Sequence, residues 1–379
     1  MNVLIIPSWY STKENLTNGS FFREQAQALR ESGVNVIVAF VEVRLVSLEN
    51  INEKVEVFNE EGIKTYRIIQ GKLPKTGNVG TAIAFKSGLK KIYKEIIKEN
   101  SIDIVHLHSC IWGGLGGAFI AKKLSVPFII TEHSSYYGRF KVNFLEKFII
   151  KKSFKNANKV ISVSEYLKSY IYKYNKAEIE VIPNMVDCAE FLNNRVEKRA
   201  GEKFTFLTLC YLKNNKGVDI LIRAFCNYFK GKDVKLIIAG DGPEKDNLVK
   251  LVNDLKINDQ VIFKGALKRE EVKIEMNKCD VFALGSKFET FGVVLIEALA
   301  SGKPVISTRN GGANDIVKEE NGLLVDVDNI DEMGKGMYYM YKNYNKYDKD
   351  LIREDCIKRY SKNTIIQKLL SIYSEFNEN

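Results

Sequence analysis

Hydrophobic residues in the first half of the chain form short apolar runs that alternate with amphipathic stretches. The apolar runs predict buried strands at 2–7, 35–42, 103–108, 127–133 and 159–164. Hydrophobic spacing of three to four residues predicts helices at 20–33, 83–100 and 116–125. Strands that alternate with helices in this way are typical of βαβ units, so we expect a parallel sheet.

The second half of the chain repeats this alternation from residue 204 onward. Strands are predicted at 204–210, 234–240, 261–265, 280–285, 304–308 and 322–326, and helices at 217–230 and 291–300. We therefore predict an α/β protein of two doubly wound, Rossmann-like domains that face each other across a cleft. Ligands of open α/β sheets bind outside the carboxyl ends of the strands, so a small molecule is expected there.

The boundary between the two domains is predicted in a polar and broken segment at 183–203. We place the first domain at 1–184, the linker at 185–202 and the second domain at 203–360. Apolar spacing at 363–376 predicts a last helix, which must dock on another element.

The composition is that of a globular chain of 379 residues with 45% hydrophobic residues, enough for two cores. The six cysteines are scattered without a CxxC pair, which indicates buried free thiols in a reducing cytosol. The first apolar run has no basic residues before it and ends at Pro7, which argues against a signal peptide. No uncharged apolar window of 18 residues exists, so we expect a cytoplasmic chain without a transmembrane helix.

The net charge of +10 is concentrated in one segment, 139–159, which holds seven basic residues against one acidic residue. Lys147, Lys151 and Lys155 are spaced to share one helix face, and Arg139 precedes them. Apolar surface would come from Leu145, Phe148, Ile149 and Phe154. This pattern fits a helix that lies on an anionic membrane, but it equally fits an ordinary amphipathic helix with solvated lysines. Nucleic acid is the weaker partner, because no nucleic-acid-binding motif accompanies the patch.

All three histidines of the chain, His106, His108 and His133, lie at the ends of two predicted strands. Histidine at such a place suits proton transfer or hydrogen bonds to hydroxyl groups. The alternative for each is a structural histidine, which fits His106 better than His133. A metal site is disfavoured, because His106 and His108 have no evident third ligand.

Two loops before predicted helices carry residues that suit phosphate. Gly19 precedes the helix at 20–33, where the backbone amides at a helix N-terminus attract anions. Lys216 lies in the loop before the helix at 217–230, where an ammonium group can neutralise a phosphate. Gly240 and Gly242 indicate a tight turn after a strand, and they do not form the dinucleotide fingerprint. Alone, each of these features is also explained by an ordinary turn or a solvated lysine.

Two glutamates bracket the stretch "ETFGVVLIE", Glu289 and Glu297. Glu289 would lie in the loop before the helix at 291–300, with Glu297 roughly 12 Å further along it. The helix is apolar nearly all round and hence buried, so Glu297 needs a partner, either ligand hydroxyls or a salt bridge. The amides of Phe291 and Gly292 would face an anion at the helix N-terminus.

Together these motifs resemble the retaining GT-B glycosyltransferases of family 4, over nearly the whole chain. In the second half the matching pieces are "KG" at 216–217, "GDGPE" at 240–244, "VIFKGAL" at 261–267, the E-x7-E at 289–297, "EALASGKPVIST" at 297–308, "GG" at 311–312 and "NGLLV" at 321–325. In the first half they are "GSFFREQAQALRESG" at 19–33, "TEH" at 131–133, "VISVSE" at 160–165 and "IPNMVD" at 182–187.

The resemblance implies a role for each matching position. His133 would lie near the reacting centre, and Glu289 would bind hydroxyls of the transferred hexose. Glu297 would bind the ribose, and Lys264 would border the base. The remaining donor-binding positions are Gly19, Lys216, Gly240, Gly242, Phe291 and Gly292. The first domain would bind the acceptor, and the terminal segment 361–379 would pack back on it.

The resemblance also implies the substrates. The donor would be a nucleotide diphospho-sugar, a UDP- or GDP-sugar, used without a metal ion or other cofactor. The acceptor would be a hydroxyl of a glycan or lipid-linked oligosaccharide in bacterial surface polysaccharide synthesis, reached from the inner face of the membrane.

The chain departs from the family pattern at one notable point. The common Gly-Arg pair is replaced by Cys210-Tyr211, so an expected phosphate-binding arginine is missing, for which Lys213 could substitute. A silent sugar-nucleotide-binding subunit and a sugar-nucleotide 2-epimerase therefore remain as alternatives. Asp326-Val-Asp328 resembles a metal-binding DxD motif but lies far from the phosphate loops in sequence, which favours a turn.

Overall fold

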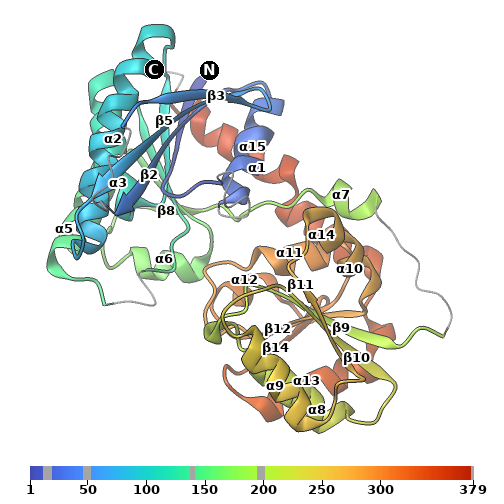
Figure 1. The fold of residues 1–379 in the computed structure, drawn as a ribbon. Coiled ribbons are helices and arrows are strands. Elements are labelled where there is room, and N and C mark those ends of the chain that lie inside the picture. Colours follow the sequence, from blue (N-terminus) through green and yellow to red (C-terminus); the bar gives the residue numbers. More distant parts are fainter. Residues whose placement is uncertain (12–18, 46–52, 137–140, 194–200, 377–379) are drawn as a thin grey trace. The chain divides into compact units, whose positions relative to one another are not determined.

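The computed structural model describes residues 1–11, 19–45, 53–136, 141–193 and 201–376. The chain forms two compact units, shown in Figure 1. Unit 1 comprises residues 1–183 and 365–379, and unit 2 comprises residues 184–364. Of the segment that the sequence assigned to a linker, residues 185–193 group with unit 2, and 194–200 lie outside the described residues.

Unit 1 is built on an eight-stranded sheet in the order β3-β4-β2-β1-β5-β6-β7-β8. Its strands are β1 Asn2–Pro7, β2 Asn35–Leu45, β3 Glu56–Glu60, β4 Ile63–Lys72, β5 Ile104–His108, β6 Phe128–Glu132, β7 Lys159–Ser162 and β8 Ile179–Val181. Neighbouring strands are parallel except β3 and β4, which form an antiparallel hairpin at one edge. The central strands are buried on both faces, which is why they appear in the sequence as continuous apolar runs.

Helices cover both faces of this sheet, as Figure 1 shows. The helices are α1 Ser20–Glu31, α2 Gly77–Glu99, α3 Cys110–Leu124, α5 Phe144–Lys155, α6 Glu165–Ile171 and α15 Lys362–Ser374. α2, α3 and α5 pack side by side on one face, and α1 and α15 lie on the other. Glycines make the close packing of α3 possible, because a Cβ atom at Gly116 would lie 2.5 Å from Leu89 of α2.

Unit 2 is built on a six-stranded, fully parallel sheet in the order β11-β10-β9-β12-β13-β14. Its strands are β9 Phe204–Leu209, β10 Val234–Ala239, β11 Val261–Gly265, β12 Val281–Leu284, β13 Val305–Thr308 and β14 Gly322–Val325. The strand order reverses between β9 and β12. A reversal of this kind opens a crevice at the carboxyl ends of the two strands, where ligands bind in doubly wound sheets.

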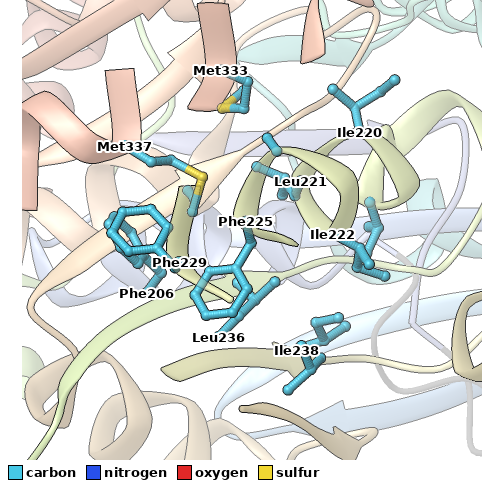
Figure 2. Close-up of a cluster of buried hydrophobic side chains, with 14 of the residues drawn as sticks. Phe206, Ile220, Leu221, Ile222, Phe225, Phe229, Leu236, Ile238, Met333 and Met337 are labelled. Atoms are coloured by element: carbon cyan, nitrogen blue, oxygen red, sulfur yellow. The ribbon is translucent and has the colours of Figure 1, made fainter. Parts of the chain in front are cut away.

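The helices of unit 2 also lie on both faces of its sheet. They are α7 Cys188–Asn193, the 3-10 helix η1 Asn214–Lys216, α8 Val218–Phe229, α9 Lys245–Leu255, α10 Arg269–Lys278, α11 Val293–Ala300, α12 Gly312–Ile316, α13 Ile330–Lys342, the 3-10 helix η2 Tyr344–Lys346 and α14 Lys349–Tyr360. One layer of the core is drawn in Figure 2, where Phe225 and Phe229 of α8 lie near Phe206 of β9 and Met337 of α13.

The two parallel α/β units confirm the predicted fold class. One predicted helix starts later than expected, since α11 begins at Val293 and not at Phe291. No helix within the described ranges is long and apolar enough to cross a bilayer.

Candidate active site

The carboxyl ends of the unit 2 strands carry the loops that hold most of the predicted donor-binding residues. The loop after β9 and the loop after β12 are joined by a hydrogen bond from the Lys287 amide to the Asn215 carbonyl, at 2.9 Å. The loop after β12 is in turn joined to the loop after β13, since the Glu289 amide donates to the Asn310 carbonyl at 3.0 Å. The three loops therefore form one connected edge of unit 2.

Glycines let these loops approach each other closely. A Cβ atom at Gly217 would lie 2.0 Å from the Gly285 carbonyl oxygen, and Gly217 has a φ of 59°. A Cβ at Gly240 would lie 1.8 Å from the Cys210 carbonyl oxygen, and one at Gly242 would lie 2.5 Å from the Leu212 carbonyl oxygen. The contacts of these glycines are thus with the neighbouring loop backbone, which explains the requirement for glycine without any ligand.

Lys216 and Glu289, which are 73 residues apart in sequence, form an ion pair with Nζ and Oε1 separated by 2.6 Å. Both side chains are about one fifth exposed, at 24% and 17%. Cys210 lies beside them: burial raises the pKa of its thiol to about 11, Lys216 lowers that pKa and Glu289 raises it further. The structure therefore brings a predicted phosphate-binding cation and a predicted hexose-binding carboxylate to one place.

The start of α11 lies directly after this ion pair. Gly292 caps the helix with a φ of 105°, in the left-handed region that favours glycine. The Phe291 ring is buried and packs edge-on against Tyr360, with centroids 5.9 Å apart. Only backbone atoms of Phe291 and Gly292 are thus positioned to serve an anion. The first amides of a helix have no partner within the helix, and the helix dipole favours negative charge there.

Glu297 is buried in α11, with 6% of its surface exposed, and forms an ion pair with Arg269 at the start of α10. The Arg269 guanidinium also lies 5.3 Å from the centroid of the Phe191 ring in α7. The salt bridge that the sequence offered as one alternative for Glu297 is therefore present. Sequence analysis missed Arg269, because 28 residues separate it from Glu297 and no spacing rule joins the two.

Two other predicted positions of unit 2 have partners of their own. Lys264, at the end of β11, pairs with Glu275 at 3.2 Å. Tyr211, which replaces the expected arginine, is 56% exposed, and the Lys213 ammonium lies 4.8 Å from the centroid of its ring. Of the DxD-like residues, Asp328 pairs with Lys287 at 2.8 Å.

In unit 1, the structure brings Gly19 and His133 into one neighbourhood. Gly19 has a φ of 73°, and a Cβ there would lie 2.9 Å from the Trp9 carbonyl oxygen. The Phe22 ring, on the first turn of α1, packs against His133 with centroids 4.9 Å apart and against Trp9 at 5.3 Å. The loop after β1 and the end of β6 therefore meet at this point.

The three histidines of unit 1 form a buried stack. His106 contacts the Tyr373 hydroxyl through Nδ1 at 2.6 Å and the Thr131 hydroxyl through Nε2 at 2.8 Å. His108 Nδ1 lies 3.0 Å from His133 Nε2. Burial lowers the pKa of His106 to about 3, and burial, with help from His106 and His133, lowers the pKa of His108 well below its usual value. Both rings are therefore neutral at physiological pH.

His106 thus has the structural role that the sequence offered as its alternative. Within the described ranges, no group of three or more histidine, cysteine, aspartate or glutamate side chains is arranged to hold a metal ion.

Glu132 is a residue of this region that sequence analysis did not single out. It is fully buried, and its carboxylate accepts hydrogen bonds from the backbone amides of Cys110, His133 and Ser134 at 2.8 to 3.0 Å. These bonds fix the ends of β5 and β6 and hence the position of His133. The only signal in the sequence is the glutamate of "TEH" at the end of an apolar strand.

The predicted basic helix is α5, and its side chains separate into two faces. Lys147, Lys151 and Lys155 are exposed, as are Phe144 at 81%, Leu145 at 57% and Phe148 at 57%. The prediction was wrong for two apolar residues, because Ile149 and Phe154 are buried against the rest of unit 1. Arg139 lies outside the described residues.

Comparison with known proteins identifies the family of this chain. The family model described as Glycosyltransferase Family 4 matches residues 19–190, and the model described as Glycosyl transferases group 1 matches residues 190–355. An uncharacterized glycosyltransferase of Methanocaldococcus jannaschii is 32% identical over 265 residues, which are 69% of this chain and 72% of that protein.

Two further relatives extend the comparison. Alpha-monoglucosyldiacylglycerol synthase of Streptococcus pneumoniae is 31% identical over 248 residues, which are 60% of this chain but only 56% of the synthase. The solved structure of Anabaena HepE in complex with UDP-glucose superposes with a TM-score of 0.72 at 17% identity, over 99% of this chain and 100% of that one. With two matching family models and this shared fold, the chain belongs to the GT-B glycosyltransferases of family 4.

Proposed function

We propose that this glycosyltransferase moves a hexose from a nucleotide diphospho-sugar to a hydroxyl of a glycan or lipid-linked acceptor, with retention of the anomeric configuration. The observation that carries the proposal is the Lys216–Glu289 ion pair next to the amide end of α11. A cation, a carboxylate and the amide end of a helix suit a diphosphate with a sugar attached. The complex of HepE with UDP-glucose supports a nucleotide-sugar donor.

We assign the hexose, the diphosphate and the ribose of the donor to successive positions along α11. Glu289 binds hexose hydroxyls, the Phe291 and Gly292 amides with Lys216 bind the diphosphate, and Glu297 binds the ribose. A buried carboxylate is a suitable ribose ligand because it accepts two hydroxyl hydrogen bonds in a site with little competing water.

The chemistry follows a same-face substitution. The bond between the anomeric carbon and the phosphate oxygen breaks, and the acceptor oxygen bonds to the same face of that carbon. The acceptor proton passes to an oxygen of the departing diphosphate, so no protein nucleophile is required. Lys216 and the α11 amides offset the negative charge that grows on the leaving group, which is the stabilisation that a metal ion supplies in other enzymes.

The missing arginine has a candidate replacement in the same loop. Lys213 lies over the exposed Tyr211 ring and extends from the segment that also carries Lys216. We assign Lys213 as a second cation for the diphosphate, with Tyr211 holding its stem. Lys213→Met should then weaken binding of a nucleoside diphosphate more than binding of the free nucleoside.

The separate roles that we assign to Glu297 and Glu289 are tested by two alanine variants. Glu297→Ala should chiefly weaken nucleoside diphosphate binding, by roughly 10²- to 10⁴-fold if two hydrogen bonds to a charged group are lost. Glu289→Ala should chiefly lower kcat. Equal affinity of wild type and Glu297→Ala for the free nucleoside diphosphate, measured by calorimetry, would contradict the ribose assignment.

The reaction itself is tested with a panel of UDP-, GDP- and ADP-sugars and a bacterial lipid-linked acceptor. Transfer with one donor, lost in Glu289→Ala, supports the proposal. Turnover of a donor without acceptor to an isomeric sugar nucleotide would indicate a 2-epimerase. Tight donor binding without any turnover would indicate a silent binding subunit.

We propose in addition that α5 holds the chain on an anionic membrane surface. Phe144, Leu145 and Phe148 expose apolar surface on the helix that also exposes three lysines, the combination by which interfacial helices bind anionic lipid. A relative is named for monoglucosyldiacylglycerol, a lipid, which supports a membrane acceptor.

Vesicle sedimentation separates this proposal from an ordinary solvated helix. Changing Lys147, Lys151 and Lys155 to Gln should abolish binding to vesicles with anionic lipid. A charge-matched control changes three exposed lysines of unit 2, Lys230, Lys250 and Lys278, and should bind as wild type. Equal binding of both triple variants, or equal binding to neutral vesicles, would refute the role of α5.

A further inference from the structure

Two cysteine thiols of unit 2 lie against each other, although they are far apart in the sequence. Cys188 is the first residue of α7, and Cys356 lies in α14. A side-chain hydrogen bond joins the two thiols, and both cysteines are in the free thiol form. Cys356 is fully buried, while 7% of the surface of Cys188 is exposed. The pair is therefore a dithiol with one member that borders the surface.

Main-chain hydrogen bonds hold the two cysteines near each other. The Val186 amide donates to the Tyr360 carbonyl at 2.9 Å, and the Lys362 amide donates to the Val186 carbonyl at 3.2 Å. The segment that leads into α7 is thus paired with the segment that follows α14. Because the backbone fixes both segments, the contact between Cys188 and Cys356 belongs to the folded state of unit 2.

The two thiols differ in acidity. The hydrogen bond from Cys356 lowers the pKa of the Cys188 thiol, against the opposing effect of burial. The same hydrogen bond, together with burial, raises the pKa of Cys356. The thiolate is the reactive form of cysteine, and oxidation follows thiolate character and exposure. Cys188 is therefore the member of the pair that reacts first with an oxidant, and Cys356 is in place to react with the product.

We propose that Cys188 and Cys356 form a redox-sensitive pair that hydrogen peroxide oxidises to a disulfide. The Cys188 thiolate attacks one peroxide oxygen, the O–O bond breaks, and a sulfenic acid forms as hydroxide leaves. The Cys356 sulfur then bonds to the Cys188 sulfur, and the sulfenic oxygen leaves as water with the Cys356 proton. The two thiols lose two electrons, and the peroxide is reduced to water. A dithiol reductant reverses the oxidation.

The disulfide would form against α11, the helix that carries Glu297. α7 and α14 both pack on α11, as Figure 1 shows. The Cys356 thiol donates to the carbonyl of Ile296 at 3.4 Å, directly before Glu297. α7 also carries Phe191, whose buried ring lies against the guanidinium of Arg269, the partner of Glu297. Bond formation draws the two sulfurs together and removes the Cys356 thiol from the Ile296 carbonyl, so it disturbs the surroundings of Glu297 from two sides.

Oxidation should therefore weaken the binding of a nucleoside diphosphate. This consequence rests on the proposed role of Glu297 in donor binding, whereas the formation of the disulfide does not.

Disulfide mapping tests the pair on the wild-type chain, without any variant or activity. The reduced protein is treated with hydrogen peroxide, its remaining thiols are alkylated in denaturant, and its peptides are analysed by mass spectrometry. We expect one cross-linked pair of peptides that joins Cys188 to Cys356 and disappears after treatment with dithiothreitol. A disulfide between other cysteines, or alkylation of all six cysteines, would overturn the inference.

The order of reaction is tested with two alanine variants and a control. In Cys356→Ala, hydrogen peroxide should convert Cys188 to a sulfenic acid that dimedone labels, because no second thiol condenses with it. In Cys188→Ala, Cys356 should stay unlabelled. The control is Cys226→Ala, a change at a partly buried cysteine of α8, which should form the disulfide as wild type does. Labelling of Cys356 without labelling of Cys188 would contradict the assigned order.

Calorimetry with UDP and GDP tests the consequence for binding. Oxidised wild type should bind the preferred nucleotide about fivefold more weakly than reduced wild type, the size of one lost hydrogen bond, and dithiothreitol should restore the affinity. Cys356→Ala should have the same affinity before and after peroxide treatment, which separates the disulfide from oxidation of methionine.

Unchanged affinity in a sample that mapping shows to be fully disulfide-bonded would refute the regulatory role. If reduced wild type bound neither nucleotide, the proposed function would fail, and the regulatory role with it. The mapping would still decide whether Cys188 and Cys356 form the redox pair.

Discussion

Acidification should destabilise unit 1 through His106, well before its carboxylates are neutralised. Burial lowers the pKa of His106 from 6.5 to about 3 in the folded chain. Below pH 6.5 the unfolded chain therefore binds a proton that the folded chain does not bind, so the free energy of unfolding falls as the pH falls. For one such histidine the loss between pH 7.5 and pH 5 is about 2 kcal/mol. His108 shifts in the same direction and adds to the loss.

Tryptophan fluorescence during urea unfolding provides a selective assay. The chain has two tryptophans, Trp9 and Trp112, and both lie in unit 1 with ring centroids 6.1 Å apart. The signal thus reports unit 1 even if unit 2 unfolds separately, which two-domain proteins often do. The free energy of unfolding is measured at pH 7.5 and pH 5 for wild type and for His106→Asn, with His106→Gln as a second variant.

The quantity compared is the loss of unfolding free energy between pH 7.5 and pH 5, in wild type and in each variant. Wild type should lose about 2 kcal/mol more on acidification than either His106 variant, whatever stability each variant has at pH 7.5. Because only the change with pH within each protein is compared, a general loss of packing does not mimic the effect. Equal pH dependence of wild type and both variants would refute the view that His106 is buried and neutral.

Three further predictions concern unit 2. Gly312→Ala should distort the start of α11 and weaken nucleoside diphosphate binding in calorimetry, because a Cβ there would lie 2.3 Å from the Phe291 carbonyl oxygen; wild-type affinity would contradict this. Phe225→Ala should lower the free energy of unfolding of unit 2 by about 3–5 kcal/mol, since the ring is fully buried. The measurement is urea unfolding followed by circular dichroism. A loss below about 1 kcal/mol would be inconsistent with the core in Figure 2. Burial raises the pKa of the Cys210 thiol to about 11, so Cys210 should react slowly with iodoacetamide at pH 8. Because the Lys216 ammonium lowers that pKa, the reaction should be slower still in Lys216→Met. Alkylation is followed by mass spectrometry, and faster alkylation in the variant would argue against the contact.

The hydrophobic pattern predicted the central strands well because parallel strands buried on both faces leave continuous apolar runs. The predicted strand at 204–210 contains β9 with one extra residue at its end, and that at 127–133 contains β6 with one extra residue at each end. The hairpin of β3 and β4 was not predicted. β3 lies at the sheet edge with exposed positions, so its sequence has no apolar run.

The pattern could not assign the faces of α5. Apolar residues occur on more than one side of this 12-residue helix, so spacing alone does not decide which of them pack inward. Tertiary packing buries Ile149 and Phe154 and leaves Phe144 and Phe148 exposed. The prediction of an apolar and basic surface was therefore right in kind but wrong in two of its residues.

In the candidate site, the contacts between residues distant in sequence could not be predicted either. Sequence motifs suggested Lys216, Glu289 and Glu297 as candidates, because the family resemblance lies in short contiguous segments. Their partners are distant in sequence: Arg269 reaches Glu297 from another helix, and Tyr373 reaches His106 across 267 residues. Contacts of this kind depend on how elements pack, and no local periodicity encodes them.

The two glutamates that bracket α11 are each held by a cation, and this has a consequence for donor binding. Under the proposed function, a bound diphosphate would share Lys216 with Glu289, because the ammonium has three N–H donors and can serve both. Lys216 would then contact both the charged leaving group and Glu289, the carboxylate that we propose binds the hexose. Glu297 differs, because Arg269 lies at α10 and not among the phosphate loops, so its carboxylate stays oriented whether or not a diphosphate is bound. In the proposed donor site, the ribose end is therefore held in place before the donor binds, while at the hexose end Lys216 gains the diphosphate as a second partner.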